Sequence, residues 1–347
     1  MKLGSKQLDS SFIIAELSAN HNNDFELAKE TIYAMKESGA DCVKLQTYTA
    51  DSLSLNADTK YFEPRKEGLW KGYRPYDLYQ EASMPWEWQP KLIELAESLE
   101  MVCFSSPFDF KAVDFLEELN TPAYKIASFE IQDIPLIRYV ASKGKPVIMS
   151  TGIATQEDIE LAVKTCREQG NDQIALLKCT SAYPTPFNEI NLNVIPDMKD
   201  RFGVEVIGLS DHTMGSTVPL GAVAIGARII EKHFVLDRSN GGVDASFSME
   251  PQEFKHMVDS VRDLEKALGT VTYDLTEKAL DSRTRGRSLF IVEDLKAGEV
   301  LTEKNIKSVR PGAGLHPKYY DEVLGKSIKK DVAKGTPLND NLIYENT

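Results

Sequence analysis

The chain has 347 residues, of which 42% are hydrophobic and 27% charged, a composition typical of a globular protein with one large domain or a large and a small one. Its formal net charge of −13 argues against a general binder of nucleic acid or anionic membranes, because both need a basic face, but an anionic small substrate stays open. The printed sequence contains no secretory signal and no apolar run of the roughly 18 residues that a membrane helix needs, so we expect a cytoplasmic protein.

Eight short apolar runs, each bounded by polar turns, alternate with segments of helical spacing. The runs cover residues 12–16, 42–46, 102–106, 124–128, 147–151, 175–179, 206–211 and 229–234. The helical segments cover residues 25–40, 90–100, 110–119, 134–144, 156–170, 217–227 and 251–269. Eight strand–helix units over roughly 250 residues predict an α/β protein with a (β/α)₈ TIM barrel. A doubly wound sheet is the alternative, although no Gly-rich phosphate loop follows the first run.

Two segments interrupt this regular spacing. Residues 49–90 form a long insertion after the second run, rich in Tyr, Trp and Pro, and long loops after barrel strands tend to be lids or pockets. From about Ser282 the pattern changes to short strands, Gly turns and many lysines. We therefore predict a barrel domain over residues 1–270, a linker over 271–285 and a small C-terminal domain over 286–347.

Polar residues stand at the carboxyl ends of the predicted strands, which meet at one mouth in a barrel. They are Glu16, Lys44, Gln46, Ser105, Ser106, Lys125, Ser128, Ser150, Thr151, Lys178, Ser181, Ser210, Asp211, His212, Glu231 and His233. Burying several lysines without partners would cost several kcal/mol each, so we expect an anion among them. Phosphate suits this set, because Lys supplies charge and Ser and Thr hydroxyls supply hydrogen bonds.

Two of the five histidines close neighbouring strands. His212 ends the seventh predicted strand and His233 the eighth, and these strand ends are adjacent in a closed barrel. A single His on an apolar run is usually a core residue, but two such residues beside Asp211 and Glu231 favour a shared metal ion. Two protein nitrogens leave several coordination positions open, which suits a catalytic site.

With these residues assembled, the chain resembles the sialic acid synthase family over nearly its whole length, and within it the pseudaminic branch. The neuraminic branch has Gly-Ile where this chain has Ser18-Ala19, and Asn where it has Ser181. The motifs that carry the resemblance are FIIAELSANHN, VKLQTYTADSL, CFSSPFD, AYKIASFE, MSTGIAT, LLKCTSAYPTP, GLSDHT, IIEKHF and SVRPGAGLHPK.

The resemblance implies a transferase that condenses phosphoenolpyruvate with an N-acetylated amino-sugar aldehyde, here 2,4-diacetamido-2,4,6-trideoxy-altrose. The products would be a nine-carbon 2-keto sugar acid and phosphate. It also implies a divalent metal on His212 and His233, Mn²⁺ first with Mg²⁺ or Co²⁺ as alternatives. The small domain resembles the antifreeze-like (SAF) module, which implies a domain-swapped homodimer in which Arg310 enters the partner's barrel.

The resemblance also implies roles for individual residues. Glu16 and Glu231 are the acid–base candidates, Glu16 also being a sugar contact, and the two histidines complete the catalytic set. Phosphoenolpyruvate is expected at Lys44, Ser106, Lys125, Ser128, Ser150, Ser181 and Ser210, and the sugar also at Tyr183, Asp244 and Arg310.

Three alternatives stay open from the sequence. The first is a related synthase that makes N-acetylneuraminate or legionaminate. The second is a Schiff-base aldolase that uses Lys44, Lys125 or Lys178 as its nucleophile. The third is a non-catalytic carbohydrate- or ice-binding protein, suggested by the terminal module.

Overall fold

The computed structural model describes residues 1–183 and 185–344. The chain divides into two compact units, Met1–Gly269 and Thr270–Thr347, which are described separately. The last three residues of the predicted small domain, 345–347, lie outside the described residues.

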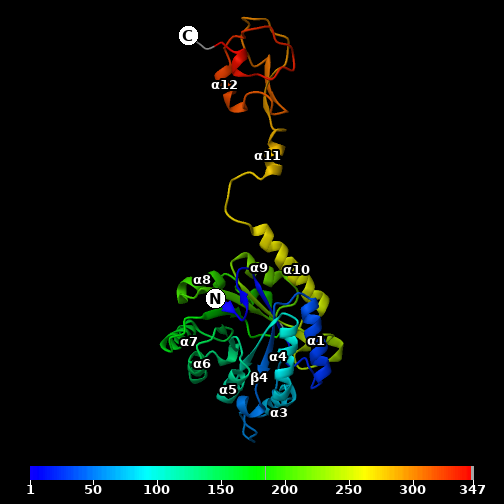
Figure 1. The fold of residues 1–347 in the computed structure, drawn as a ribbon, viewed down its shortest axis with the longest axis vertical. Helices are drawn as coiled ribbons and strands as arrows, with labels where there is room; N and C mark the ends of the chain where they lie inside the picture. The colour runs from blue at the N-terminus through cyan, green and yellow to red at the C-terminus, as the bar shows by residue number, and fades with distance from the viewer. Residues whose placement is uncertain (184, 345–347) are drawn as a thin grey trace. The chain divides into compact units, whose positions relative to one another are not determined.

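The first unit contains a closed barrel of eight parallel strands, as the spacing of apolar runs predicted (Figure 1). Around the barrel the strands follow the order β10-β3-β4-β5-β6-β7-β8-β9. Each strand lies within two residues of its predicted bounds. The strands are β3 (Phe12–Glu16), β4 (Cys42–Thr47), β5 (Val102–Pro107), β6 (Tyr124–Ile126), β7 (Val147–Ser150), β8 (Ile174–Cys179), β9 (Val206–Asp211) and β10 (Ile229–His233).

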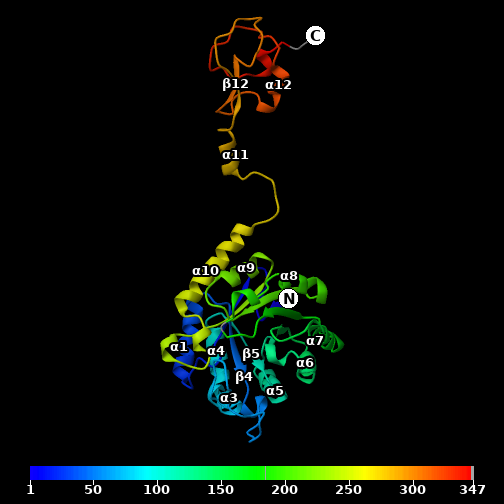
Figure 2. The ribbon, with the colours of Figure 1, turned by 180° about the vertical axis from the view of Figure 1, so that it is seen from behind.

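Helices surround the barrel in both views (Figures 1 and 2). Helix α8 was not predicted, although its apolar residues Ile195, Met198 and Phe202 are buried at helical spacing; Pro196 is tolerated there because it lies in the first turn. The helices are α1 (Phe25–Glu37), α2 (Ala50–Leu53), α3 (Pro75–Ala82), α4 (Gln89–Ser98), α5 (Phe110–Glu118), α6 (Ile134–Ala141), α7 (Gln156–Glu168), α8 (Val194–Phe202), α9 (Thr217–Ala224) and α10 (Pro251–Leu268).

The barrel interior changes from apolar to polar along the strands. Side chains alternate across a strand, so every second residue points into the barrel. In β3 this series runs from Phe12 through Ile14 to Glu16, and in β10 from Ile229 to Glu231. The apolar members pack into one buried cluster with Leu3 of the amino-terminal hairpin: Phe12, Ile14, Cys42, Val102, Phe104, Ala123, Ile148, Ala175, Leu177, Val206 and Ile229. The polar members are therefore confined to the carboxyl ends of the strands.

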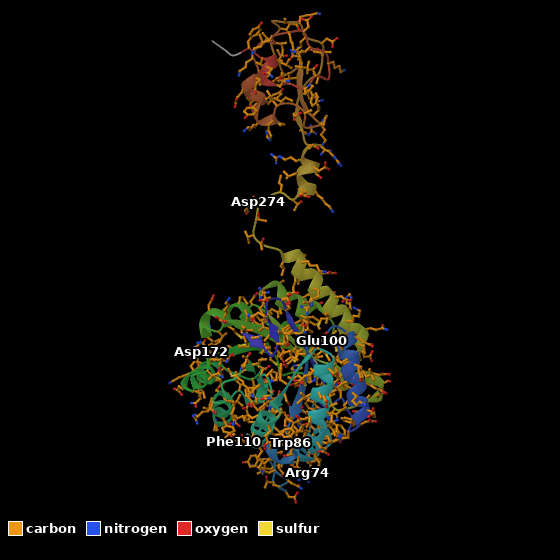
Figure 3. The ribbon with its side chains drawn as sticks, in the orientation of Figure 1. Arg74, Trp86, Glu100, Phe110, Asp172 and Asp274 are labelled. Carbon is orange, nitrogen blue, oxygen red and sulfur yellow. The ribbon has the colours of Figure 1, made fainter. Side chains whose placement is uncertain are left out.

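The two ends of the barrel are visible in Figure 3. Arg74, Trp86 and Phe110, which follow strands, lie toward one end, whereas Glu100 and Asp172, which precede strands, lie toward the other. In barrel enzymes the loops that follow the strands build the active site. The insertion after β4 belongs to that end.

The second unit has a small core of its own. Helix α11 (Glu277–Arg283) precedes an antiparallel pair, β11 (Ser288–Ile291) and β12 (Ile306–Val309), and α12 (Tyr320–Val323) follows. Its core consists of Leu289, Ile291, Leu295, Leu301, Ile306, Val323, Ile328, Val332, Leu338, Leu342 and Ile343. Across both units, the helices that the structure describes include none with the length and apolar character to cross a membrane.

Candidate active site

A cavity of about 270 Å³ lies at the carboxyl ends of the barrel strands. Its floor is formed by strand residues and its wall by the loops that follow. Eleven of the predicted site residues line it: Glu16, Lys44, Lys125, Ser128, Ser150, Tyr183, Ser210, His212, Glu231, His233 and Asp244.

Lys44 lies at the centre of the floor, between two carboxylates. In the strand register Glu16 is aligned with Lys44 on one side and with His233 on the other. The Lys44 Nζ atom is 2.9 Å from Glu16 Oε2 and 2.8 Å from Glu231 Oε1, and all three side chains are almost completely buried. The premise that the buried lysines lack partners is therefore wrong for Lys44, because the barrel register supplies two anions.

The electrostatics keep these three groups ionised. Burial alone would lower the pKa of Lys44, but the two carboxylates raise it above its usual range. Burial alone would raise the pKa of Glu16, yet the neighbouring His233 and Lys44 hold it well below its ordinary value. The pKa of Glu231 is also lowered, by Lys125 and Lys44 acting against burial.

Lys125 is the less compensated cation of the floor. Its Nζ atom donates to Ser150 Oγ at 2.7 Å and to the Ile126 carbonyl at 3.0 Å, and it lies 3.8 Å from Glu231 Oε1. Burial lowers its pKa, against the attraction of Glu231. Ser210 donates to the same Glu231 oxygen at 3.0 Å. A lysine surrounded by hydroxyls is a suitable partner for a phosphate or carboxylate.

The two predicted metal ligands lie side by side. The ring centroids of His212 and His233 are 5.3 Å apart. His212 directly follows β9 and His233 is the last residue of β10, the strand adjacent to β9. The Nδ1 atom of His212 is 3.2 Å from the Thr180 carbonyl, an arrangement that leaves its other ring nitrogen for a cation. The Nε2 atom of His233 is 3.2 Å from Glu16 Oε2.

These residues fit a divalent metal with open coordination positions. The Nδ1 atom of His233 is buried without a hydrogen-bond partner, and so is Oε2 of Glu231. Within residues 1–183 and 185–344, no group of three or more His, Cys, Asp and Glu side chains is arranged to hold a metal. The protein would thus supply two imidazoles, leaving room for substrate or water, as catalytic metal sites do.

The upper wall of the cavity is aromatic. Tyr183 packs between His212 and Phe247, at centroid distances of 4.6 and 4.9 Å. Asp244 accepts a hydrogen bond from the Ser18 hydroxyl. The other apolar and aromatic residues of this wall include Tyr48, Leu53, Trp70, Leu78, Tyr79, Phe108 and Phe129. The cavity therefore combines a charged floor with an apolar wall.

Seven residues singled out from the sequence do not line the cavity, two of them being Ser105 and Thr151. Ser106 is buried on β5 and its hydroxyl has no hydrogen-bond partner, and Ser181 reaches Ser128 Oγ at 2.7 Å. Lys178 bonds to the Cys179 carbonyl at 2.6 Å, and Asp211 pairs with a lysine outside the lumen. Arg310 is exposed in the second unit, at the end of β12.

Other cavity residues were not assigned from the sequence. Glu130 follows Ser128 in a 3-10 turn, and burial raises its pKa to about 7. Its Oε2 atom is buried without a hydrogen-bond partner. The aromatic insertion was expected to form a lid or pocket, but its pattern could not indicate that Trp70 and Arg65 reach the cavity, because the path of a long loop is set by tertiary contacts.

Comparisons with known proteins find relatives that match over most of the chain. The chain is 48% identical over 342 residues to pseudaminic acid synthase of Campylobacter jejuni strain 81-176, covering 98% of this chain and 99% of that protein. It is also 48% identical to pseudaminic acid synthase of Helicobacter pylori, covering 94% and 96%. A crystal structure of N-acetylneuraminic acid (sialic acid) synthetase from Leptospira borgpetersenii, in complex with citrate, matches with a TM-score of 0.72 and 30% identity, covering 81% and 94%.

The family models divide the chain as the fold does. A SAF domain model matches residues 286–343, within the second unit. The NeuB family model matches residues 31–273, well over half of the chain. The chain belongs to the NeuB family and is an enzyme of the synthase type found there.

Proposed function

We propose that this enzyme is a pseudaminic acid synthase. It would condense phosphoenolpyruvate with 2,4-diacetamido-2,4,6-trideoxy-altrose and release phosphate. The support is the 48% identity, over almost the full length, to two proteins that carry this name. The observation in the structure that carries the proposal is the floor of the cavity, where Lys44 and Lys125 lie among hydroxyls beside two adjacent imidazoles.

Phosphoenolpyruvate would bind at the floor. Lys125, Ser150 and Ser210 offer an ammonium and two hydroxyls within the cavity, and Lys44 adds a second positive charge. Ser106, whose buried hydroxyl lacks a partner, is aligned with the cavity residue Gln46 and is a further candidate donor. Ser128 lines the cavity and is hydrogen-bonded to Ser181. Phosphoenolpyruvate would compete with Glu231 for Lys44 and Lys125, so its negative charge would replace part of the ion pairing between Glu231 and these lysines.

The sugar would occupy the upper part of the cavity, against Tyr183 and Asp244. A divalent metal, which we propose to be Mn²⁺, would be held by His212 and His233 and would supply Lewis-acid polarisation of the aldehyde oxygen. Carbon 3 of phosphoenolpyruvate attacks the aldehyde carbon, whose oxygen takes up a proton, and a water that gives up a proton adds to carbon 2, where positive charge develops. The bond between carbon 2 and the phosphate oxygen then breaks, which releases phosphate and leaves the 2-keto group. The site contributes mainly by holding the two reactants in this orientation.

Two carboxyl groups are suited to move protons in this reaction. Glu16 is ionised, and its orientation is fixed by Gln46, which donates to Glu16 Oε1 at 2.8 Å. Glu16 can therefore accept a hydrogen bond from a sugar hydroxyl, and it is one of the two acid–base candidates. Glu231 bridges the two lysines and is the second acid–base candidate.

We further propose that the second unit completes the site of a partner copy in a domain-swapped homodimer, with Arg310 as the residue contributed. The support is the SAF match at residues 286–343 and the exposure of Arg310. Removal of residues 285–347 should leave a folded barrel with little activity. Full activity of the truncated chain would refute the contribution of Arg310.

The experiment that tests the proposed function is a phosphate-release assay with phosphoenolpyruvate and three sugars. These are the diacetamido-trideoxy altrose, its legionaminic-type isomer and N-acetylmannosamine. We expect the highest kcat/KM with the altrose derivative and loss of turnover in chelator, restored by Mn²⁺. A higher kcat/KM with either of the other two sugars would show that the proposed sugar substrate is wrong. Full turnover in chelator would show that the reaction needs no metal.

Lys125 supports a second candidate, the Schiff-base aldolase, because its lowered pKa makes the free amine more accessible. Lys44 is doubly paired and Lys178 lies outside the cavity, so neither serves this role. Inactivation by borohydride in the presence of pyruvate would favour the aldolase. Stoichiometric release of phosphate from phosphoenolpyruvate would exclude it.

A further inference from the structure

The insertion after β4 carries a short hairpin at residues 65–73. The Arg65 amide donates to the Tyr73 carbonyl at 2.9 Å, and the Gly72 amide donates back to the Arg65 carbonyl at 2.8 Å. Trp70 lies near the tip of this hairpin. Its indole Nε1 donates to the carbonyl of Val243, in the loop after β10, at 2.9 Å.

This hairpin reaches across the mouth of the barrel. The Trp70 ring packs against Tyr183 at a centroid distance of 5.6 Å, and Tyr183 lies in the loop after β8. In the closed barrel β4 and β8 are four strands apart, on opposite sides of the eight-stranded ring. Because Trp70, Tyr183 and Val243 all line the cavity, the contact between the two rings spans the cavity above its charged floor.

A cation also packs on the Trp70 ring. The Arg65 guanidinium lies over the indole, with Cζ 5.1 Å from the ring centroid, and its Nη2 atom is 3.5 Å from the Tyr79 hydroxyl. A cation over an indole face is attractive, so the ring has a defined position before any ligand binds. The indole nitrogen is already satisfied by Val243, which leaves only apolar ring surface for the cavity.

We propose that Trp70 is a specificity-determining residue that contacts the sugar. This inference rests on the proposed function, in which the substrate has a methyl group at carbon 6 and two acetamido methyl groups. Methyl groups gain by burial against an aromatic wall, whereas a hydroxyl buried there without a partner is penalised. Trp70 therefore selects a deoxygenated, diacetylated sugar over one that carries hydroxyls at the same positions.

The test is the Michaelis constant of each substrate in Trp70→Ala and Trp70→Phe. In Trp70→Ala, the KM for the diacetamido sugar should rise about 10-fold or more, the discrimination expected for lost methyl contacts in an apolar pocket. The KM for phosphoenolpyruvate, which binds at the floor, should change less than about twofold. Trp70→Phe should restore part of the sugar affinity, and it also serves if the alanine variant does not fold.

Trp86 provides a matched control from the same insertion (Figure 3). Its indole Nε1 also donates to a backbone carbonyl, that of Tyr48, at 3.2 Å, and its ring packs on Phe115 at 4.9 Å. Unlike Trp70, it does not line the cavity. Trp86→Phe should therefore leave both KM values unchanged, even where it lowers the unfolding temperature.

A second readout is the preference for the diacetamido sugar over N-acetylmannosamine, measured as substrate or as competitive inhibitor. Trp70→Ala should reduce this preference about 10-fold. Equal increases in both KM values, or an unchanged preference, would overturn the role of Trp70. If the wild-type enzyme instead turns over a different sugar, the proposed function fails, and the comparison of sugar KM with phosphoenolpyruvate KM still tests Trp70 on that sugar.

Discussion

Two buried ionic clusters in the barrel meet at neighbouring positions of strand β10, yet they differ in how completely their polar atoms are hydrogen-bonded. Glu231 points into the lumen and meets Lys44, whereas the next residue, Lys232, points outward and pairs with Asp211 at 2.7 Å. The outer pair is complete, because Lys232 also donates to the Thr213 carbonyl, and both Asp211 oxygens accept from Thr213.

The lumen cluster is incomplete by the same measure. Glu231 Oε2 is buried without a hydrogen-bond partner, and the nearby Nδ1 of His233 also lacks one. Buried polar groups are normally hydrogen-bonded, so two unsatisfied atoms beside a cavity need an explanation, and a bound ligand or ion would supply one. The outer pair thus finds its partners within the fold, whereas the inner cluster keeps polar atoms without partners at the place where we propose that substrate binds. Four variants test this difference.

The largest effect is expected from Lys44→Met. The change removes the cation between Glu16 and Glu231, and these two carboxylates then repel the negatively charged phosphoenolpyruvate. We therefore expect kcat/KM to fall by about 100- to 1,000-fold. The two carboxyls can respond by taking up a proton, so stability should suffer less than activity. Phosphate release and urea unfolding on the same preparations measure both, and a variant that keeps near wild-type turnover would refute the role of the cluster.

Lys232→Met should have the opposite profile. It leaves Asp211 buried without its cation, and breaking such a pair typically costs about 3–5 kcal/mol of unfolding free energy. The KM values of the folded fraction should stay close to wild type, because neither residue lines the cavity. Urea unfolding provides the measurement, and an unchanged unfolding free energy would show that the outer pair is not structural.

The double variant Asp211→Leu with Lys232→Met should recover part of that loss. Replacing both charges of a buried pair by apolar groups is often close to neutral, although here Thr213 also loses its partner. A double-mutant cycle with the two single variants gives the coupling energy. Strictly additive losses would contradict a direct interaction between the two side chains.

The smallest effect is expected at an exposed pair. Lys255 and Asp259 form an ion pair one turn apart on α10, 2.8 Å between Nζ and Oδ2, with both side chains more than half exposed. Water and salt screen such pairs, so Lys255→Ala should change neither activity nor the unfolding midpoint measurably. A clear change in activity or in the unfolding midpoint would mean that an exposed ion pair contributes as much as a buried one.

The sequence was sufficient to predict the barrel, the strand bounds and the set of residues at the strand ends. Each strand is a continuous apolar run because both of its faces are covered, and this signal is local. The partners of Lys44 could not be predicted, since they depend on the register of β3, β4 and β10. The approach of Trp70 to Tyr183 was also hidden, because it depends on how a long loop crosses the mouth.

The four cysteines differ in a way that can be used experimentally. All four are buried free thiols, but Cys179 alone among them lines the cavity, next to His212. Burial raises the pKa of the Cys42, Cys103 and Cys166 thiols, which protects them from alkylation. The wild-type enzyme thus carries a built-in chemical reporter, and the rate at which a small electrophile modifies it, with and without each substrate, would map occupancy without any engineered label.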